Sequence, residues 1–366
     1  LNPVVVTAAL APRTANESLS SVTVIGEAAL RRQDPVSITD LLRGQPGVDV
    51  SSNGSFGKTS SAYLRGTSNE STLLMIDGIR LRSATAGGAA WQYLDPRMFQ
   101  RAEIVRGPRG SLYGPWHDAT MMLEGDIARC LGELGRQRWR NAGGDELEPV
   151  ESEESPWPDD LDAQFEDVEI GIARTRAEYE ELSQICEIET LMLRQIAGAK
   201  KLIYFENQYL TSRKITDAIA ERLKEDDPPE IVIVHPTTAE GWLEAQAMDH
   251  ARDCLVHSLR EIDDKDRFGI YVPFTGETPI YVHAKIAIFD DEILRIGSAN
   301  LNNRSMGLDS ECDVFIDATR PGNEHAREGI AALRHSLLAE HCGLEPKEVP
   351  ELLEKHGSMA CLIDHA

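Results

Sequence analysis

The chain has 366 residues, with 37 lysines and arginines against 61 aspartates and glutamates, and a formal net charge of −24. Since 41% of its residues are apolar and 27% are charged, it can bury a core and is not a disordered polyanion. The acidic balance argues against a protein that coats nucleic acid, because phosphate backbones favour basic surfaces. The sequence also lacks a continuous apolar run long enough for a membrane-spanning helix.

The charges and the cysteines are distributed unevenly along the chain. Residues 1–114 hold 12 basic and 9 acidic side chains and no cysteine, whereas residues 115–366 hold 25 and 52 and all six cysteines. No two cysteines form a Cys-x-x-Cys pair, so the sequence predicts buried or half-buried free thiols rather than a zinc site or a disulfide scaffold. The step at residue 114 predicts two domains, 1–114 and 115–366.

The first segment is predicted to contain short strands separated by turns, with one helix among them. The strands are expected at 21–25, 47–50, 61–64, 72–77 and 102–106. The helix is expected after the first strand, capped by Asp34-Pro35 or by Ser37, with Ile38, Leu41 and Leu42 on one face. This pattern predicts a small α/β domain of about 100 residues. The chain begins without a methionine and without a basic leader, which indicates a processed start or a fragment.

Three stretches of the first segment carry motifs in a fixed order. They are ITDLLRGQPGV at 38–48, LRG at 64–66 with LLMIDGIR at 73–80, and AEIVRGP at 102–108 with SLYG at 111–114. Together they resemble the plug domain of TonB-dependent outer-membrane receptors. A plug works inside a barrel of about 22 strands. The 252 residues that follow are too few for such a barrel and alternate helix with strand, so we do not expect transport by this chain alone.

The same resemblance implies a TonB box at residues 3–8. This box is an extended strip that a TonB-type energy-coupling partner captures by strand addition. Its members here are Val4, Val5, Val6 and Thr7.

Residues 115–366 alternate helices and strands, which predicts a layered α/β domain with a mixed sheet. Strands are expected at 121–123, 168–173, 202–206, 231–234, 267–273, 280–289, 294–296 and 313–316. Helices are expected at 127–139, 185–196, 215–223 with Ser212 as cap, 241–262, 323–341 and 348–355. Residues 145–167 hold 11 acidic side chains in 23 positions and are predicted to be a solvated loop. The fold class of the whole chain is therefore α/β, or α+β overall.

The residues suited to catalysis concentrate in the run VHAKIAIFD at 282–290. The run is apolar on both faces, which indicates an interior strand. The period of two in a strand places His283 and Lys285 on the same side. Asp290 has the opposite parity, so on an unbulged strand it faces away from them and braces the fold.

The turn at 297–300, reading GSAN, follows this run after six residues. It supplies small residues and the polar side chains of Ser298 and Asn300, where a backbone can approach a ligand closely. A cation, an imidazole and neutral donors together suit a phosphate oxyanion. No cluster of His, Asp or Glu with metal-ligand spacing accompanies them, so we expect phosphodiester chemistry without a metal or another cofactor.

The arrangement His-x-Lys, four residues, Asp, six residues, Gly-Ser-x-Asn matches the signature of the phospholipase D superfamily. FENQY at 205–209, LDSECD at 308–313, VEIGIA at 168–173 and PWHD at 115–118 also resemble segments of these enzymes. The resemblance spans residues 115 to about 345. It implies a phosphohistidine mechanism on a phospholipid or another phosphodiester, with a catalytic set of His283, Lys285, Asp290, Ser298, Asn300 and Glu311.

The resemblance also implies roles for individual side chains. Glu311 stands where the family keeps a carboxylate that hydrogen-bonds the catalytic histidine and fixes its tautomer. Asn207 and Gln208 stand at the border of the substrate pocket. Asp118 resembles the carboxylate that orients the other catalytic histidine of the family, so it is counted with the substrate-binding residues.

The chain departs from the family pattern in one respect that affects the mechanism. Phospholipase D enzymes of this size carry two His-x-Lys motifs, one histidine attacking phosphorus and the other protonating the leaving alcohol. Only His283 belongs to such a motif here, so it would be a general acid without its nucleophile. We therefore expect little or no turnover by one chain, unless two copies pair their motifs in a homodimer.

Three interpretations follow from these motifs. The chain is a phospholipase D-like hydrolase or transferase, a receptor plug module, or a composite of both fragments in which neither function is complete. We favour the composite, which a fusion, a rearrangement or an assembly error at Gly114–Pro115 would produce. The compartment is left open, because a plug belongs to the periplasm and outer membrane whereas unpaired cysteines suit a cytoplasmic enzyme.

Overall fold

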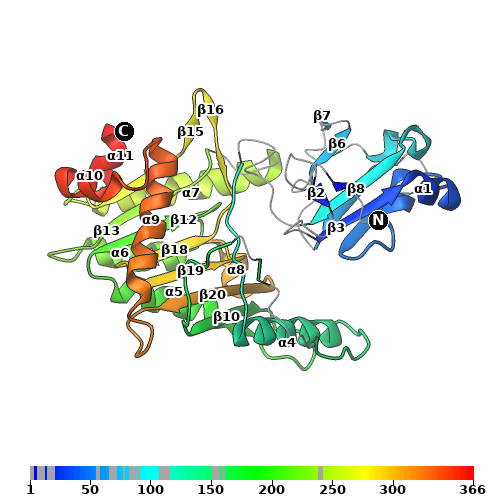
Figure 1. The fold of residues 1–366 in the computed structure, drawn as a ribbon. Coiled ribbons are helices and arrows are strands. Elements are labelled where there is room, and N and C mark those ends of the chain that lie inside the picture. The colour runs from blue at the N-terminus through cyan, green and yellow to red at the C-terminus, as the bar shows by residue number, and fades with distance from the viewer. Residues whose placement is uncertain are drawn as a thin grey trace. The chain divides into compact units, whose positions relative to one another are not determined.

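The computed structural model describes residues 4–5, 13–14, 21–54, 58–65, 72–76, 79–81, 89, 91–106, 116–150, 157–158, 161–237 and 242–366. The chain divides into two compact units, one built mainly from Leu1–Gly114 and the other from Pro115–Ala239 and Gln246–Ala366 (Figure 1). Each unit has a hydrophobic core of its own. The mixed α/β class predicted from the sequence is confirmed.

The first unit consists of paired short strands and short helices. The antiparallel pairs are β1 (Val4–Val5) with β2 (Arg13–Thr14), β3 (Ser21–Gly26) with β8 (Arg101–Arg106), β4 (Val48–Ser52) with β5 (Ser60–Leu64), and β6 (Leu74–Ile76) with β7 (Ile79–Leu81). The helices are α1 (Glu27–Gln33), α2 (Ile38–Leu42) and the 3₁₀ turns η3 (Trp91–Tyr93) and η4 (Pro96–Met98). Helix α1 was not predicted.

Helix α2 begins at the second of the two predicted caps. Ser37 accepts a hydrogen bond from the backbone of Asp40, whose carboxylate in turn accepts one from the Ser37 backbone. Such a reciprocal pair satisfies two N–H groups that the first helical turn leaves unbonded. The predicted apolar face is confirmed, because Ile38, Leu41 and Leu42 are all buried.

Several predicted features of the first segment lie outside the described residues. Val6 and Thr7 of the expected TonB box are among them, as are Gly66, residues 77–78 and the whole stretch 107–115 that contains the expected join. Val4 and Val5 are described as strand β1, which pairs with β2.

The second unit is built on an eight-stranded mixed sheet in the order β11-β10-β20-β19-β18-β12-β13-β14. Its strands are β10 (Ile170–Arg176), β11 (Ile185–Cys186), β12 (Leu202–Glu206), β13 (Glu230–Val234), β14 (Phe268–Tyr271), β18 (Ile286–Phe289), β19 (Ile293–Gly297) and β20 (Glu311–Asp317). Only β12, β13 and β14 run parallel to one another. The remaining neighbours in the sheet are antiparallel.

Helices cover both faces of this sheet, which makes a three-layer α/β/α unit (Figure 1). Ile203 and Phe205 of β12 pack in the core on one face, with α5 (Glu187–Gly198), α6 (Arg213–Leu223) and α7 (Trp242–Ile262). Tyr204 packs in the core on the other face, with α9 (Ala326–Cys342), α10 (Val349–His356) and α11 (Met359–His365). The side chains of β12 alternate between two buried faces, which explains the continuous apolar sequence of this strand.

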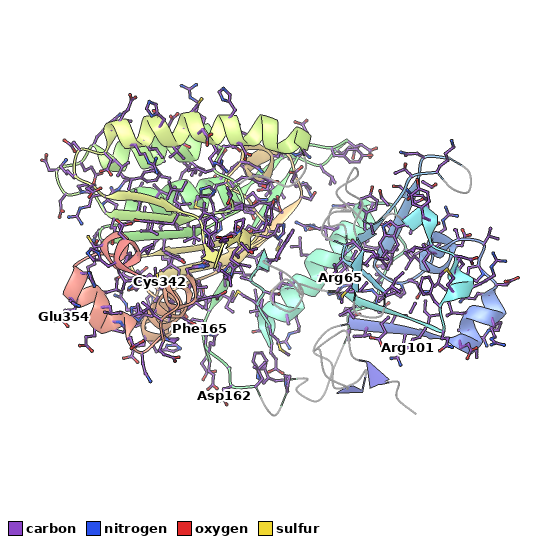
Figure 2. All side chains as sticks on the ribbon, turned by 90° about the horizontal axis from the view of Figure 1, so that it is seen from above. Arg65, Arg101, Asp162, Phe165, Cys342 and Glu354 are labelled. Carbon is purple, nitrogen blue, oxygen red and sulfur yellow. The ribbon has the colours of Figure 1, made fainter. Side chains whose placement is uncertain are left out.

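Shorter elements complete the second unit. They are β9 (Trp116–His117), α4 (Asp126–Asn141), α8 (Asn303–Gly307), β15 (Phe274–Thr275), β16 (Thr278–Pro279) and β17 (Tyr281–Val282). Phe165 and Cys342, the last residue of α9, pack against the core that α9, α10 and α11 share (Figure 2). No helix in the described part of the chain combines the length and the apolar character needed to cross a membrane.

Four expectations for the second unit are wrong. Residues 121–123 are not a strand, and residues 280–289 form two short strands with a break between them. Ser212 begins α6, but its hydroxyl makes no capping hydrogen bond. The cysteines are free as predicted, yet Cys130, Cys254 and Cys361 are exposed rather than buried.

Candidate active site

His283 and Lys285 lie in the three-residue link between β17 and β18, where the predicted strand is interrupted. The N–H groups of His283 and Ala284 donate to the carbonyl oxygen of His117, at 2.7 and 3.2 Å. Strand β17 thereby pairs in parallel with β9. The strand breaks because the backbone of this link bonds to a segment more than 160 residues away in sequence rather than to a neighbouring strand of the sheet.

The imidazole of His283 is held by one carboxylate. Its Nδ1 lies 3.0 Å from Oδ2 of Asp118, and the two side chains are 28% and 21% exposed. Burial alone would raise the pKa of Asp118, but the hydrogen bond with His283 and the nearby charge of Lys285 outweigh it and lower that pKa. Since Nδ1 is occupied, Nε2 is the ring nitrogen left for chemistry.

Lys285 lies beside this pair and is tied to two acceptors. Its Nζ donates to the carbonyl oxygen of His283 and, at 3.3 Å, to Oε1 of Gln208. The Gln208 amide nitrogen in turn donates to the hydroxyl of Tyr281 at 2.7 Å. Burial lowers the pKa of Lys285 to about 8, although the carboxylates nearby oppose the shift. The expected border residue Gln208 therefore does lie beside the His-x-Lys motif.

Within the described residues Glu311 makes no hydrogen bond with His283, contrary to the role that the resemblance implied. It accepts a hydrogen bond from Oγ of Ser298 at 2.5 Å instead. Burial raises the pKa of Glu311, with Asp313 nearby adding to the shift, while the hydrogen bond from Ser298 opposes it. Asp118 takes the place at His283 because it follows β9, the strand that pairs with β17.

The turn that carries Ser298 and Asn300 is held by a carboxylate that sequence reasoning did not single out. Oδ1 of Asp313 accepts from the backbone N–H groups of Ser298 and Ala299, at 3.0 and 3.1 Å. Its other oxygen pairs with the buried guanidinium of Arg295. Within the part of the chain that the structure describes, Oδ1 of Asn300 is buried and has no hydrogen-bond partner.

Two of the predicted site residues hold the backbone rather than face a ligand. Asn207 is buried, and its Oδ1 accepts from the N–H groups of Tyr209 and Leu301, at 3.1 and 3.0 Å. Asp290 accepts from three consecutive N–H groups at residues 200–202, at 2.7 to 2.9 Å. Asp290 thus braces the start of β12, the structural role expected for it, although the unbroken strand on which its parity was counted is not present.

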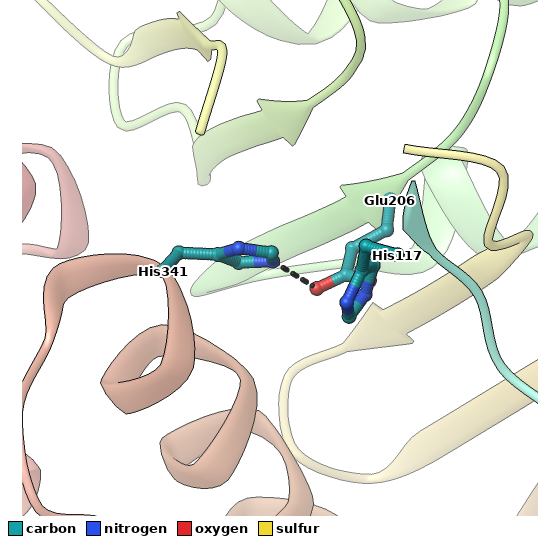
Figure 3. Close-up of side chains that lie close together, drawn as sticks. All are labelled: His117, Glu206 and His341. Atoms are coloured by element: carbon teal, nitrogen blue, oxygen red, sulfur yellow. Dashed lines mark hydrogen bonds and ion pairs between the residues drawn. The ribbon is translucent and has the colours of Figure 1, made fainter. Parts of the chain in front are cut away.

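A second cluster of titratable side chains surrounds His117, the last residue of β9. Nε2 of His117 is 2.5 Å from Oε2 of Glu206, its Nδ1 is 2.9 Å from Oε1 of Glu340, and Nε2 of His341 is 2.9 Å from Oε1 of Glu206. Figure 3 shows the carboxylate of Glu206 between the two imidazoles. The hydroxyl of Tyr204 also donates to Glu206, at 2.6 Å.

This arrangement shifts the pKa values of the cluster in opposite directions. Burial alone would lower the pKa of His117, but its two carboxylate partners raise it to about 10. Burial would raise the pKa of Glu206, but its hydrogen bonds with His117 and His341 lower it well below the usual range. The sequence offered only a partial signal for this cluster: the PWHD and FENQY motifs drew attention to residues 115–118 and 205–209, and nothing pointed to His341.

Comparison with known protein families supports both resemblances found in the sequence motifs. Residues 14–116 match the family model described as the TonB-dependent Receptor Plug Domain, and residues 271–364 match the model described as Phospholipase D. The second match covers His283, Lys285 and the turn at 297–300, whereas residues 117–270 lie outside both matches.

Two similar proteins are vitamin B12 transporters BtuB of Vibrio vulnificus. The chain is 40% identical to the transporter of strain YJ016 and 35% identical to that of strain CMCP6, in each case over 111 residues. Those residues are 30% of this chain and 18% of each transporter. The chain thus spans less than a fifth of the length of these relatives.

Three solved structures are similar to part of the chain. Nuc of Salmonella typhimurium, a phospholipase D family member, is 17% identical, covers 46% of this chain and 90% of its own, and has a TM-score of 0.31. NucT of Helicobacter pylori is 16% identical over 45% and 97% of the two chains, with a TM-score of 0.31. The phosphatidylserine synthase of Haemophilus influenzae Rd KW20 is 13% identical over 51% and 45%, with a TM-score of 0.37.

Proposed function

We propose that the second unit carries one half of a phospholipase D-type site for a phosphodiester. His283 is its reacting imidazole, and Lys285 is its cation for the phosphate oxyanion. One chain is weak or inactive by itself, because its 366 residues contain a single His-x-Lys motif. Two chains that bring their His283 side chains together would make a complete site.

The pairing of His283 with Asp118 is the observation that carries this proposal. A carboxylate on Nδ1 fixes the tautomer and orientation of an imidazole, so that Nε2 is presented for attack or proton transfer. The ammonium of Lys285 donates to the backbone carbonyl oxygen of His283, and its pKa of about 8 leaves it mostly protonated near neutral pH.

In the paired site the reaction proceeds by two displacements at phosphorus. Nε2 of one His283 attacks and forms a P–N bond, while the P–O bond to the leaving alcohol breaks. The protonated His283 of the other chain gives its proton to that alkoxide, and then takes a proton from an incoming water or alcohol that breaks the P–N bond. Water as the acceptor gives hydrolysis, and an alcohol gives transfer. The substrate is a phospholipid or another phosphodiester.

The proposal can be tested by hydrolysis of bis(p-nitrophenyl) phosphate with the purified full chain at high concentration. We expect slow turnover that falls to the buffer background in His283→Asn. The matched control is His335→Asn, a half-buried histidine of α9 outside the site, which should keep the wild-type rate. Turnover that survives in His283→Asn would refute the proposal.

A second function is supported for the first segment by its similarity to the vitamin B12 transporters over 111 residues. We propose that this segment is a plug-type module whose residues 3–8 bind a TonB-type partner by strand addition. A binding assay between the full chain and the C-terminal domain of such a partner tests it. Val5→Pro should abolish binding, because proline removes an N–H donor from the strip, whereas equal binding by Val5→Pro and the wild type would contradict it.

A further inference from the structure

Three side chains from distant parts of the sequence converge on one buried point in the second unit. His117 comes from β9, Glu206 from the end of β12, and His341 from the last turn of α9 (Figure 3). One ligand atom of each lies within 4.8 Å of the others. Glu206 is fully buried, and the side chains of His117 and His341 are 7% and 10% exposed.

Two imidazole nitrogens and one carboxylate oxygen form a donor set that proteins use for zinc. The two rings meet edge to face with centroids 4.8 Å apart, and each directs its Nε2 at the same carboxylate. His117 points at Oε2 of Glu206 and His341 at Oε1. Tetrahedral bonds of about 2.0 Å place donor atoms about 3.3 Å apart. The two N–O pairs at 2.5 and 2.9 Å would therefore open slightly, and any pair near the upper separation of 4.8 Å would close.

The surroundings of the three donors match those of a metal-binding histidine. A ligating imidazole usually donates its other N–H to a carboxylate, which fixes the tautomer and makes the ligand more basic. Glu340 provides that carboxylate to Nδ1 of His117 at 2.9 Å. The Tyr204 hydroxyl, at 2.6 Å, likewise fixes the carboxylate of Glu206.

The local charge also favours a divalent cation. Glu206 and Glu340 bring two carboxylates to a region where Glu206 has no access to water. In the described residues around this cluster, neither lysine nor arginine hydrogen-bonds to either of them. In the metal-free protein the protonated imidazole of His117 supplies the positive charge that buried Glu206 needs, so a bound ion would displace the proton on Nε2 of His117 and take over this role.

We propose that His117, Glu206 and His341 bind one divalent transition-metal ion, with zinc as the preferred ion. Glu340 orients His117 from the outer shell through its hydrogen bond to Nδ1. This site is separate from the His283 site, but His117 bonds through its backbone to the His283 link. A bound ion would therefore fix β9 and keep Asp118 beside His283.

The proposal is tested by zinc titration of the chelator-treated full chain, followed by calorimetry and by the metal content after dialysis. The starting protein carries Cys130→Ser, Cys254→Ser and Cys361→Ser, because these exposed thiols bind zinc adventitiously. We expect one zinc per chain. A cobalt-loaded sample should show tetrahedral d–d bands without thiolate charge-transfer absorption.

Two variants on α9 distinguish the site from surface binding. His341→Gln should abolish the stoichiometric binding, and Glu340→Gln should weaken it about 10- to 100-fold. The control His257→Gln changes an exposed histidine, 76% exposed, and should bind like the parent. Circular dichroism of each metal-free variant reports whether it is folded.

No zinc retained by the parent, or equal affinity in His341→Gln and the parent, would overturn the proposal. Because binding is measured directly, this outcome is independent of whether the chain hydrolyses a phosphodiester.

Discussion

Two histidines of the second unit, His117 and His283, are joined by a backbone hydrogen bond of 2.7 Å and yet occupy opposite environments. His117 is 7% exposed and has a carboxylate on each ring nitrogen. His283 is 28% exposed and has one carboxylate, Asp118, on Nδ1. The first ring has both nitrogens engaged, whereas the second keeps Nε2 for chemistry.

This difference shows that residue type alone does not decide whether a histidine is structural or available for chemistry. Its burial and the number of its carboxylate partners decide it. A ring with both nitrogens bonded to carboxylates is fixed and charged, which suits an anchor. A ring held at one nitrogen and partly open to solvent suits proton transfer or nucleophilic attack. The contrast leads us to expect large stability effects around His117 and small ones around His283.

The largest effect is expected at the centre of the buried cluster. Glu206→Gln removes the negative charge that both imidazoles contact and should cost about 3 to 5 kcal/mol of the free energy of unfolding of the second unit. Urea unfolding, followed by hydrogen exchange in β12 and α9, measures it. Glu221→Gln, on an exposed carboxylate of α6, should change nothing measurable. A loss in Glu206→Gln no larger than in this control would remove the distinction between the two histidines.

The second largest loss of stability is expected when Glu206 loses the hydrogen bond from Tyr204. Tyr204→Phe deletes the hydroxyl that donates to Glu206 at 2.6 Å and keeps the packed ring. It should cost about 1.5 to 3 kcal/mol, the range for hydrogen bonds to charged groups. The same unfolding assay applies, and a cost near zero would show that the two imidazoles alone satisfy Glu206.

A smaller effect, of opposite sign, is expected beside His283. Burial lowers the pKa of Lys285 from 10.5 to about 8, so the charged form is disfavoured in the folded state. The resulting loss of folding stability is fully present below pH 8 and disappears as the pH rises to 10.5. Lys285→Met should therefore stabilise the chain by about 1 to 2 kcal/mol at pH 7, after subtraction of its lost hydrogen bonds.

The pH series provides the control for this variant. The stabilisation by Lys285→Met should shrink steadily between pH 8 and 10.5 in thermal unfolding curves. A stabilisation that is constant across this range would show that packing, not the charge of Lys285, causes it.

The smallest effect on stability is expected for the carboxylate of His283. Asp118→Asn keeps the shape of a partly exposed side chain and should cost less than about 1 kcal/mol. It should nevertheless reduce any phosphodiester turnover strongly, because the imidazole loses the group that fixes its tautomer. Glu311→Gln, which affects Ser298 instead, is the matched comparison and should reduce turnover less. The reverse order would restore Glu311 as the functional partner of the His283 imidazole.

Local features of the fold could be predicted from the sequence because their causes are local. Ser37 and Asp40 have the spacing of a capping box, and α2 begins there. The apolar run at 202–206 is β12 with the predicted bounds. The polar turn at 297–300 likewise followed from the spacing of its residues.

Features that depend on distant partners could not be predicted in this way. The break at 283–285 exists because β17 pairs with residues 116–117. The assignment of Asp118 rather than Glu311 to His283 depends on the same pairing. The cluster of His117, Glu206 and His341 forms only where three distant segments meet in the fold. The sequence around His341 contains no motif that indicates this cluster.

We propose that one chain holds an incomplete phosphodiester site. The most direct test is the rate of bis(p-nitrophenyl) phosphate hydrolysis per chain, measured over a dilution series whose oligomeric state is followed by sedimentation. We predict a rate per chain that falls to the buffer background as the chain becomes monomeric. A rate per chain that stays constant in the monomer and is abolished by His283→Asn would contradict the account.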